Sequence, residues 1–144
     1  MIINLVDPKE LVGVDECSRD LDRAELSSLL NENMTHYNGV GLSANQIGIQ
    51  ERAFVMMSDM ETQQTIVCFN PKIVKTYNEV ELMEEGCLSF PDLLLPIPRY
   101  ARIVVKYEDE DKKPHKKKLS GFIARIFQHE YDHMEGIDFT QRQL

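Results

Sequence analysis

Two histidines near the C-terminus, in Gln128-His129-Glu130-Tyr131-Asp132-His133, constrain the fold more than any other feature of the chain. The apolar stripe of a predicted helix runs through Phe122 and Ile126, and the two histidines continue it at offsets of three and four. Burying unpartnered imidazoles costs roughly 1 to 3 kcal/mol each, whereas one shared metal ion satisfies both. The pattern therefore favours a metal site on the buried face of this helix over two half-buried histidines without a ligand.

Glu130 directly follows the first histidine. A carboxylate at that position lies close to the metal without having to bind it, which suits a general base acting on a water molecule. A catalytic site also needs about three protein ligands and an open position. Cys87, in Glu85-Gly86-Cys87-Leu88-Ser89, is the candidate third ligand, because a thiolate with two imidazoles is a strong donor set for a divalent transition metal.

Ahead of this helix the sequence predicts one helix and several short strands. Asp22, with Glu25 three residues on, indicates a helix start, and Asn38-Gly39 indicates its stop. Runs of β-branched and aromatic residues between turn formers predict strands at 53–57, 65–69, 72–75 and 103–107. We expect a turn at Asn70-Pro71. After Cys87 we expect an irregular extended loop because of three prolines, Pro91, Pro96 and Pro98.

These elements predict an α+β fold, with antiparallel β-sheets surrounding a buried C-terminal helix that carries the His-Glu-x-x-His motif. A chain of 144 residues suffices for one domain with a sizeable core, so we expect a single domain over 1–144. The segment 39–48 contains glycines and small residues. It predicts a structural turn, or alternatively a backbone that passes very close to another group.

The overall charge of −8 argues against direct nucleic-acid binding. The basic run 112–118 follows the acidic run 108–111, which is typical of a solvated hairpin. Three cysteines without disulfide spacing indicate a reducing compartment, and no apolar stretch has the length of a membrane span. We therefore expect a cytoplasmic protein with no membrane association.

Three segments taken together resemble the polypeptide deformylase family. They are the glycine-rich stretch ending in Gln46, the stretch from Glu85 to Ser89, and the stretch from Gln128 to His133, in the family's order. The resemblance implies removal of the N-formyl group from the N-terminal formyl-methionine of nascent polypeptides, with release of formate. It also implies one divalent ion, natively Fe2+ and readily replaced by Zn2+, Ni2+ or Co2+.

The resemblance also implies roles for individual residues, with Cys87, His129 and His133 as metal ligands and Glu130 as the proton shuttle. Gln46 and the backbone N–H of Leu88 would stabilise the oxyanion, and the backbone around Val40, Gly41 and Gly86 would bind the peptide. From the residues themselves we predict that Glu85 and Arg99 pair beside the cysteine. Met83 and Phe122 are further candidates for the side-chain pocket.

The chain departs from many family members in two places. Ser43 and Asn45 stand where smaller or different residues are usual. The chain ends at Leu144, soon after Gly136, whereas many members continue with a further helix. This ending resembles reduced forms, including viral ones, and leaves association with the ribosome without support. Two alternatives stay open, namely a His-Glu-x-x-His metallopeptidase and a non-catalytic deformylase-like binding protein.

Overall fold

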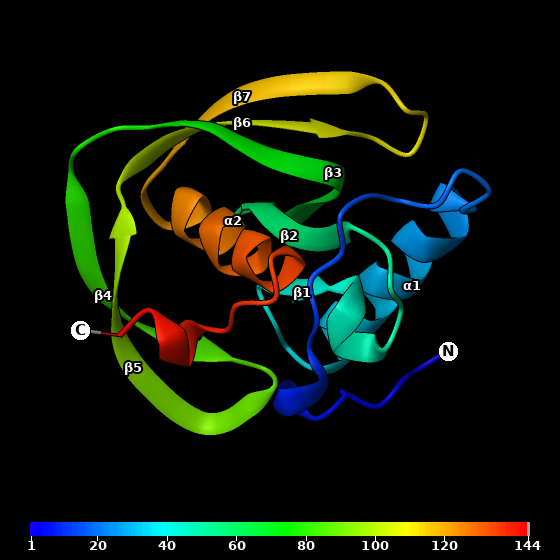
Figure 1. Cartoon of the computed structure of the whole chain (residues 1–144), viewed down its shortest axis with the longest axis horizontal. Coiled ribbons are helices and arrows are strands. Elements are labelled where there is room, and N and C mark those ends of the chain that lie inside the picture. Colours follow the sequence, from blue (N-terminus) through cyan, green and yellow to red (C-terminus); the bar gives the residue numbers. More distant parts are fainter. Residues whose placement is uncertain (144) are drawn as a thin grey trace.

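The structure is a computed structural model that describes residues 1–143. Helix α2 lies at the centre, with strands on several sides of it (Figure 1). The helices and strands, in chain order, are α1 (Arg23–His36), β1 (Gly41–Ser43), β2 (Ala53–Asp59), β3 (Gln64–Thr76), β4 (Val80–Cys87), β5 (Phe90–Tyr100), β6 (Arg102–Glu108), β7 (Pro114–Ser120) and α2 (Gly121–Met134). Short 3-10 turns lie at Pro8–Glu10 (η1), Ala44–Ile47 (η2) and Phe139–Gln141 (η3).

The described strands form two antiparallel sheets. One sheet has the order β1-β2-β3-β6-β7, and the other is the pair β4-β5. Helix α2 contacts strands of both sheets, and ten of its side chains are buried. The predicted α+β class, with antiparallel sheets around a buried C-terminal helix, is confirmed. The expected single domain over 1–144 includes Leu144, which lies outside the described residues.

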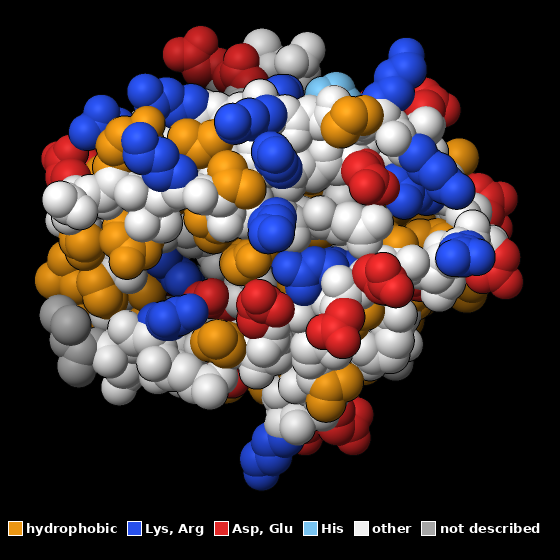
Figure 2. Space-filling view, turned by 45° about the horizontal axis from the view of Figure 1, so that its top comes forward, with side chains coloured by type: hydrophobic (Ala, Val, Ile, Leu, Met, Phe, Trp, Pro, Cys, Tyr) orange, Lys and Arg blue, Asp and Glu red, His pale blue; other side chains and the backbone are white. Residues whose placement is uncertain are grey.

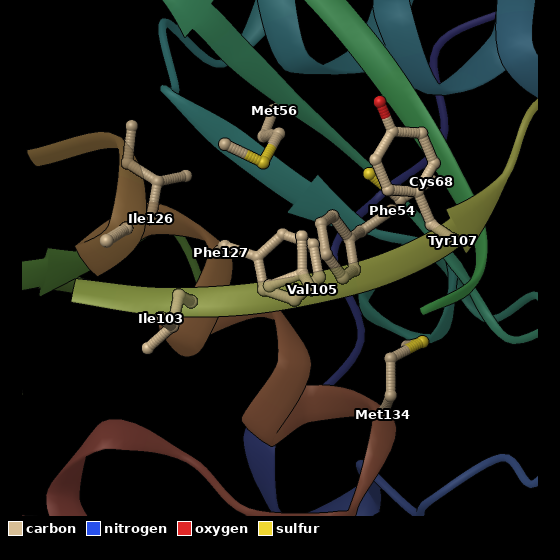
Figure 3. Close-up of a cluster of buried hydrophobic side chains, with 10 residues drawn as sticks. Phe54, Met56, Cys68, Ile103, Val105, Tyr107, Ile126, Phe127 and Met134 are labelled. Carbon is tan, nitrogen blue, oxygen red and sulfur yellow. The ribbon is translucent and has the colours of Figure 1, made fainter. Parts of the chain in front are cut away.

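Strand β2 separates two apolar clusters, because successive side chains of a strand point to opposite faces. Phe54 packs on the α2 side, where its ring meets that of Phe127 edge to face at 5.1 Å (Figure 3). Val55 points the other way, toward Leu30 and the rest of the buried face of α1. Full burial of a side chain such as Phe127 contributes about 1.5 to 3 kcal/mol. The first cluster therefore fixes α2 firmly against the sheet.

Helix α1 begins where the sequence predicts. The Asp22 side chain accepts a hydrogen bond from the backbone N–H of Glu25 at 3.0 Å, which caps the first turn. The helix ends at His36, and Asn38 has a positive φ of 56° before the chain turns into β1. Its buried side chains include Leu26, Leu30 and Met34.

Two expectations about strands are wrong. The turn expected at Asn70-Pro71 is instead a bend within the continuous strand β3, where Asn70 has a φ of 51° and the register with β6 shifts. The loop expected after Cys87 is mostly strand β5. Each strand of a two-stranded sheet has one open edge. Pro96 and Pro98 are two residues apart, so their nitrogens, which carry no hydrogen, can both face that edge, where no hydrogen bond is needed.

The hairpin expected from the opposite charge runs is present as β6 and β7, paired from Arg102↔Ser120 to Glu108↔Pro114. Strand β4 was not predicted, because its sequence shows no regular alternation of apolar and polar residues, and most of its side chains are exposed. No helix among residues 1–143 has the length and hydropathy needed to cross a membrane.

Candidate metal centre

Three side chains from two elements converge at the end of strand β4. Helix α2 carries His129 and His133 one turn apart, with ring centroids 4.8 Å apart. Cys87 is the last residue of β4, and its Sγ lies 3.8 Å from Nε2 of His133. One ligand atom from each of the three residues lies within 4.8 Å of the others. Residues separated by more than 40 positions are thus brought together where the sequence predicted a metal site.

His129 is oriented by Glu85. Its Nδ1 lies 2.9 Å from Glu85 Oε1, so the N–H at that position donates to the carboxylate and Nε2 is left to face the centre. Arg99 donates to both oxygens of Glu85, from Nε at 2.9 Å and from Nη2 at 3.0 Å. The predicted pairing of Glu85 with Arg99 is therefore confirmed, and it holds the carboxylate that positions the ring.

The same carboxylate belongs to a larger buried network. Arg125 donates from Nη1 to Glu85 Oε2 at 2.6 Å, and Arg99 also reaches Asp132 Oδ2 at 2.6 Å. Arg142 donates two hydrogen bonds to Asp132, of 3.0 and 2.9 Å. Buried charges are tolerated when each is paired and hydrogen-bonded, as they are here. This network ties α2, β4, β5 and the segment after η3 together behind the centre.

His133 is oriented from the opposite side. Ser43 Oγ lies 3.0 Å from Nδ1 of His133 and 2.7 Å from Oδ1 of Asn45. An N–H at Nδ1 of His133 can donate to the Ser43 hydroxyl, and that hydroxyl then donates to Asn45. Nε2 of His133 is left without a proton and faces Cys87. Asn45 also donates to the backbone carbonyl of His133 at 2.8 Å. Ser43 and Asn45 therefore support the second histidine in this chain.

Glu130 is 3% exposed and lies beside the same centre. Its Oε1 has no hydrogen-bond partner among the described residues, although Nδ1 of His133 lies 3.2 Å away. That nitrogen has a better-placed partner in Ser43, at 3.0 Å. A buried carboxylate oxygen without a donor costs the fold free energy, so its presence indicates a role at the site. Glu130 is thus available to hold or move a proton.

Gln46 reaches the centre from η2. Its Oε1 accepts from Ser43 N at 3.0 Å, which identifies Nε2 as the donor end of the amide. Nε2 lies 2.9 Å from Ser89 Oγ and 3.7 Å from Cys87 Sγ. An amide nitrogen carries two hydrogens, so one can serve Ser89 while the other points into the site.

The pKa values show how strongly the ligand atoms interact. Burial by itself raises the pKa of Cys87, but hydrogen bonds with His129 and His133 outweigh it and lower this pKa from 9.0 to about 6. Burial by itself lowers the pKa of His129, but the hydrogen bonds with Cys87 and Glu85 raise it to about 10. The pKa of His133 is raised to about 9, because Glu130 and Cys87 outweigh the effect of burial. The site thus stabilises a thiolate.

This donor set fits a divalent transition metal. A thiolate and two imidazoles whose other nitrogens are held by hydrogen bonds are the ligand types that Zn2+ and Fe2+ accept, and the ligand atoms are close enough to share one ion. Metal binding would replace the protons that the imidazoles otherwise hold. With three protein ligands, such a centre keeps a coordination position for water or substrate.

A cavity of about 670 Å³ opens onto the centre. Its walls include the predicted substrate residues Val40, Gly41 and Gly86, the predicted oxyanion residues Gln46 and Leu88, and the centre residues Cys87, His129 and Glu130. Phe122, a candidate for the side-chain pocket, also lines the cavity. Met83, the other candidate, is 41% exposed and is not among the lining residues.

Gly41 lies so close to Glu130 that a side chain would not fit. A Cβ built on Gly41 would meet Glu130 Oε2 at 2.6 Å. Residues 41–43 form strand β1, paired with β2, and 44–47 form η2. The preferred reading of this segment as a structural turn is therefore wrong, and the alternative of a close backbone approach is right.

The comparisons with known proteins agree with this geometry. The sequence profile of the family described as "Polypeptide deformylase" matches residues 8–143. The chain belongs to the polypeptide deformylase family. It is 43% identical over 131 residues to "Peptide deformylase 2" of Prochlorococcus marinus (strain MIT 9313), covering 90% of this chain and 63% of that relative. The chain thus spans less than two thirds of the length of that relative.

Solved structures of polypeptide deformylases share the fold. The crystal structure of the peptide deformylase from Thermotoga maritima has a TM-score of 0.88 and 35% identity, covering 100% of this chain and 97% of that one. A peptide deformylase from Acinetobacter baumannii with Met-Ala-Ser bound has a TM-score of 0.87 and 29% identity, covering 99% and 98%.

Sequence reasoning missed the polar residues behind the three candidate metal ligands. Arg125, Asp132 and Arg142 form the network around Glu85, and Ser43 holds His133. Asp132 lies inside the motif itself, one residue before His133. An acidic residue at that position was the one feature of the sequence that could have indicated a buried polar network. The partners of Arg125 depend on how β4 and β5 wrap around α2, which no local pattern indicates.

Proposed function

We propose that this chain is a metal-dependent hydrolase that removes the N-formyl group from the N-terminal formyl-methionine of nascent polypeptides and releases formate. The observation that carries the proposal is the convergence of Cys87, His129 and His133 beside the buried carboxylate of Glu130. Membership of the deformylase family supports it, as does the Met-Ala-Ser peptide bound by the Acinetobacter baumannii relative.

Cys87, His129 and His133 would hold one divalent ion, with Fe2+ as the expected native metal and Zn2+, Ni2+ or Co2+ as replacements. Such an ion supplies Lewis acidity, which polarises a carbonyl and makes water a better nucleophile near neutral pH. Glu85 keeps Nδ1 of His129 occupied, and Ser43 does the same for His133. The remaining ring nitrogens are thereby held in the orientation that coordination needs.

Glu130 would act as general base and then as general acid. Its Oε1 has no hydrogen-bond partner among residues 1–143, so it can accept a proton from the attacking water. The carboxyl can then deliver this proton to the leaving nitrogen of the formamide.

Gln46 and Leu88 would stabilise the negative charge that develops on the formyl oxygen. The orientation of the Gln46 amide is set by Ser43, so its Nε2 faces the site before substrate arrives. A donor held in place needs no reorganisation during the reaction, which is the basis of oxyanion stabilisation. The backbone N–H of Leu88, next to Cys87, would be the second donor.

The cavity would bind the formyl-methionyl end of a peptide. Val40, Gly41 and Gly86 would contribute backbone hydrogen bonds, and apolar lining side chains such as Phe122 and Ile126 would receive the methionine side chain. The formyl group is the smallest acyl group, so it would need little room beside Glu130, where the backbone of Gly41 passes close to the carboxylate. We further propose that residues 1–144 act as one domain and that the protein works in the cytoplasm.

One experiment separates this function from its alternatives. The protein, loaded with Ni2+ or Fe2+, is incubated with formyl-Met-Ala-Ser or with Met-Ala-Ser, and formate and free amino acids are measured. Formate release from the first peptide, with Glu130→Gln inactive at equal metal content, supports a deformylase. Cleavage of the unformylated peptide without formate release would instead support a metallopeptidase. Metal binding with neither product would indicate a binding protein.

A further inference from the structure

Cationic side chains gather on the outward face of strands β3, β6 and β7. Along β6, buried Ile103 and Val105 alternate with exposed Arg102 and Lys106, so this strand has one face toward α2 and one toward solvent. The exposed cations on the outward face of the three strands are Lys72, Lys75, Arg102, Lys106, Lys116 and Lys118, here called the cationic face. Figure 2, in which the top of Figure 1 is turned forward, shows Lys and Arg side chains gathered over this part of the surface.

The strand register places like charges directly opposite one another. Lys106 pairs with Lys72 on β3 and with Lys116 on β7, so three lysines form one row across the sheet. Neighbouring strands lie about 4.8 Å apart, and like charges at opposite positions destabilise a sheet. Val104 is flanked in the same way by Lys75 and Lys118. The row of Lys72, Lys106 and Lys116 therefore costs the fold free energy instead of stabilising it.

The chain leaves these cations without acidic partners. Among the described residues, no carboxylate forms an ion pair with a side chain of the cationic face, whereas Arg23, Arg52, Arg99, Arg125 and Arg142 are all paired. The sequence holds 24 acidic residues and a net charge of −8, so acids were available. The ring of Tyr77 holds three of the cations together, Lys75, Arg102 and Lys118, at 4.7, 4.8 and 5.2 Å from its centre.

We propose that the cationic face is a docking surface for the phosphate backbone of RNA. Unpaired cations in regular rows offer repeated contacts to a chain of phosphates, and each contact releases bound counterions. Five of the six are lysines, which bind phosphate as point charges. Val74 is the exposed large apolar side chain on these strands, so the surface lacks the apolar residues that insert into a membrane.

The charge of the rest of the molecule makes this docking directional. The net charge is strongly negative, so the acidic remainder is repelled by RNA while the cationic face is attracted. Electrostatic attraction acts over about 8 to 10 Å at physiological salt, which is within the reach of one face. The expectation from net charge alone, that the chain does not bind nucleic acid, overlooks this segregation of charge.

Docking there leaves the metal centre accessible. Helix α2 packs against the inward face of the same sheet, and none of the residues that line the cavity comes from β3, β6 or β7. A chain held on RNA by its cationic face could therefore still admit a peptide. The inference goes beyond the proposed function, and RNA binding can be measured whether or not the chain releases formate.

The test measures binding of a fluorescein-labelled single-stranded RNA of about 30 nucleotides by anisotropy, over a series of salt concentrations. With six phosphate contacts, log Kd should rise with log salt with a slope of about 4. The variant Lys106→Gln/Lys116→Gln removes two of the six contacts, so it should lower this slope by about 1.4 and weaken binding about tenfold at low salt. The matched control Lys9→Gln/Arg19→Gln removes the same charge from exposed positions elsewhere and should bind as the native chain does.

The unfolding temperature of the variant, and binding of the native chain to other anionic ligands, are measured as well. The Lys106→Gln/Lys116→Gln variant should unfold at the same or a higher temperature, because it removes repulsion between like charges. A weaker RNA complex would then reflect lost contacts and not lost structure. Equal weakening by the control variant, a slope near zero, or binding to phosphatidylserine vesicles or polyglutamate but not to RNA would each overturn the proposal.

Discussion

The backbone of Gly41 lies directly against the carboxylate of Glu130, so close that a Cβ at position 41 would sit 2.6 Å from Oε2. Both residues are buried, and Gly41 is held in strand β1 by its pairing with Met56. The strand cannot yield without disturbing the sheet, so any added atom must displace the carboxylate. The glycine thus protects the position of the proposed proton shuttle.

Gly41→Ala should therefore cut formate release by about a hundredfold or more, because misplacing a general base forfeits most of its contribution. Metal content should stay the same, since Cys87, His129 and His133 are untouched. Gly86→Ala is the comparison variant, because it changes another glycine proposed to bind the peptide, but a Cβ there would meet the flexible end of Leu94 at 3.3 Å and not Glu130. Steady-state kinetics and metal analysis of both variants check this. Equal losses in the two would remove the contact with Glu130 as the explanation.

Gln46→Ala should lower turnover by about a hundred- to a thousandfold, the usual loss when one oxyanion donor is removed. Metal content should again be unchanged. Ser89→Ala is a useful companion, because it removes only the hydroxyl that accepts from Gln46 at 2.9 Å and leaves the amide held by Ser43. We expect that companion to lose much less activity. A fully active Gln46→Ala variant would exclude this side chain from the mechanism.

Glu85→Gln should weaken metal binding about 10- to 100-fold, because the carboxylate orients His129 and the charge balances two buried arginines. The free energy of unfolding should fall by about 3 kcal/mol, the cost of breaking a buried ion pair from one side. Competition with a chelator and urea denaturation measure the two effects.

Arg142→Gln is the control for Glu85→Gln, because it removes a guanidinium that is half exposed from the far end of the same network. An exposed ion pair contributes about 1 kcal/mol or less, so both effects should be small. If Arg142→Gln weakened metal binding as much as Glu85→Gln, the orientation of His129 would depend on the whole network and not on Glu85 alone.

The three cysteines should differ in reactivity. In chelator-treated protein at pH 7, iodoacetamide should modify Cys87 first, because its pKa is lowered to about 6 and its sulfur borders the cavity. Cys68 is fully buried, and burial raises its pKa, so it should react only after unfolding. Burial also raises the pKa of Cys17, which should react slowly.

Bound metal should protect Cys87 from this reagent and leave the other two cysteines as they were. Peptide mapping by mass spectrometry, with and without Ni2+, gives the extent of modification at each position. Modification of Cys87 at the same rate with and without Ni2+ would mean that its sulfur is not a ligand.

Much of the fold followed from local patterns. Helix caps and hydrophobic periodicity depend only on residues that are close together in the sequence. We could therefore predict the start of α1 at Asp22, the strands β2 and β6, and the amphipathic helix α2. The pair β4 and β5 was missed. Both strands are largely exposed and one contains three prolines, so neither shows the alternation that marks a strand buried on one side.

The sequence by itself determined which residues could carry the chemistry, because a cysteine, two histidines one turn apart and an adjacent glutamate are recognisable from type and spacing alone. Only the tertiary structure decided that the end of β4 meets α2, that Gly41 lies against Glu130, and that Glu85 sits among two arginines and His129. It also decided that the lysines of separate strands share one face. Such contacts join residues far apart in the chain, and their geometry depends on strand register and helix packing, which no local pattern encodes.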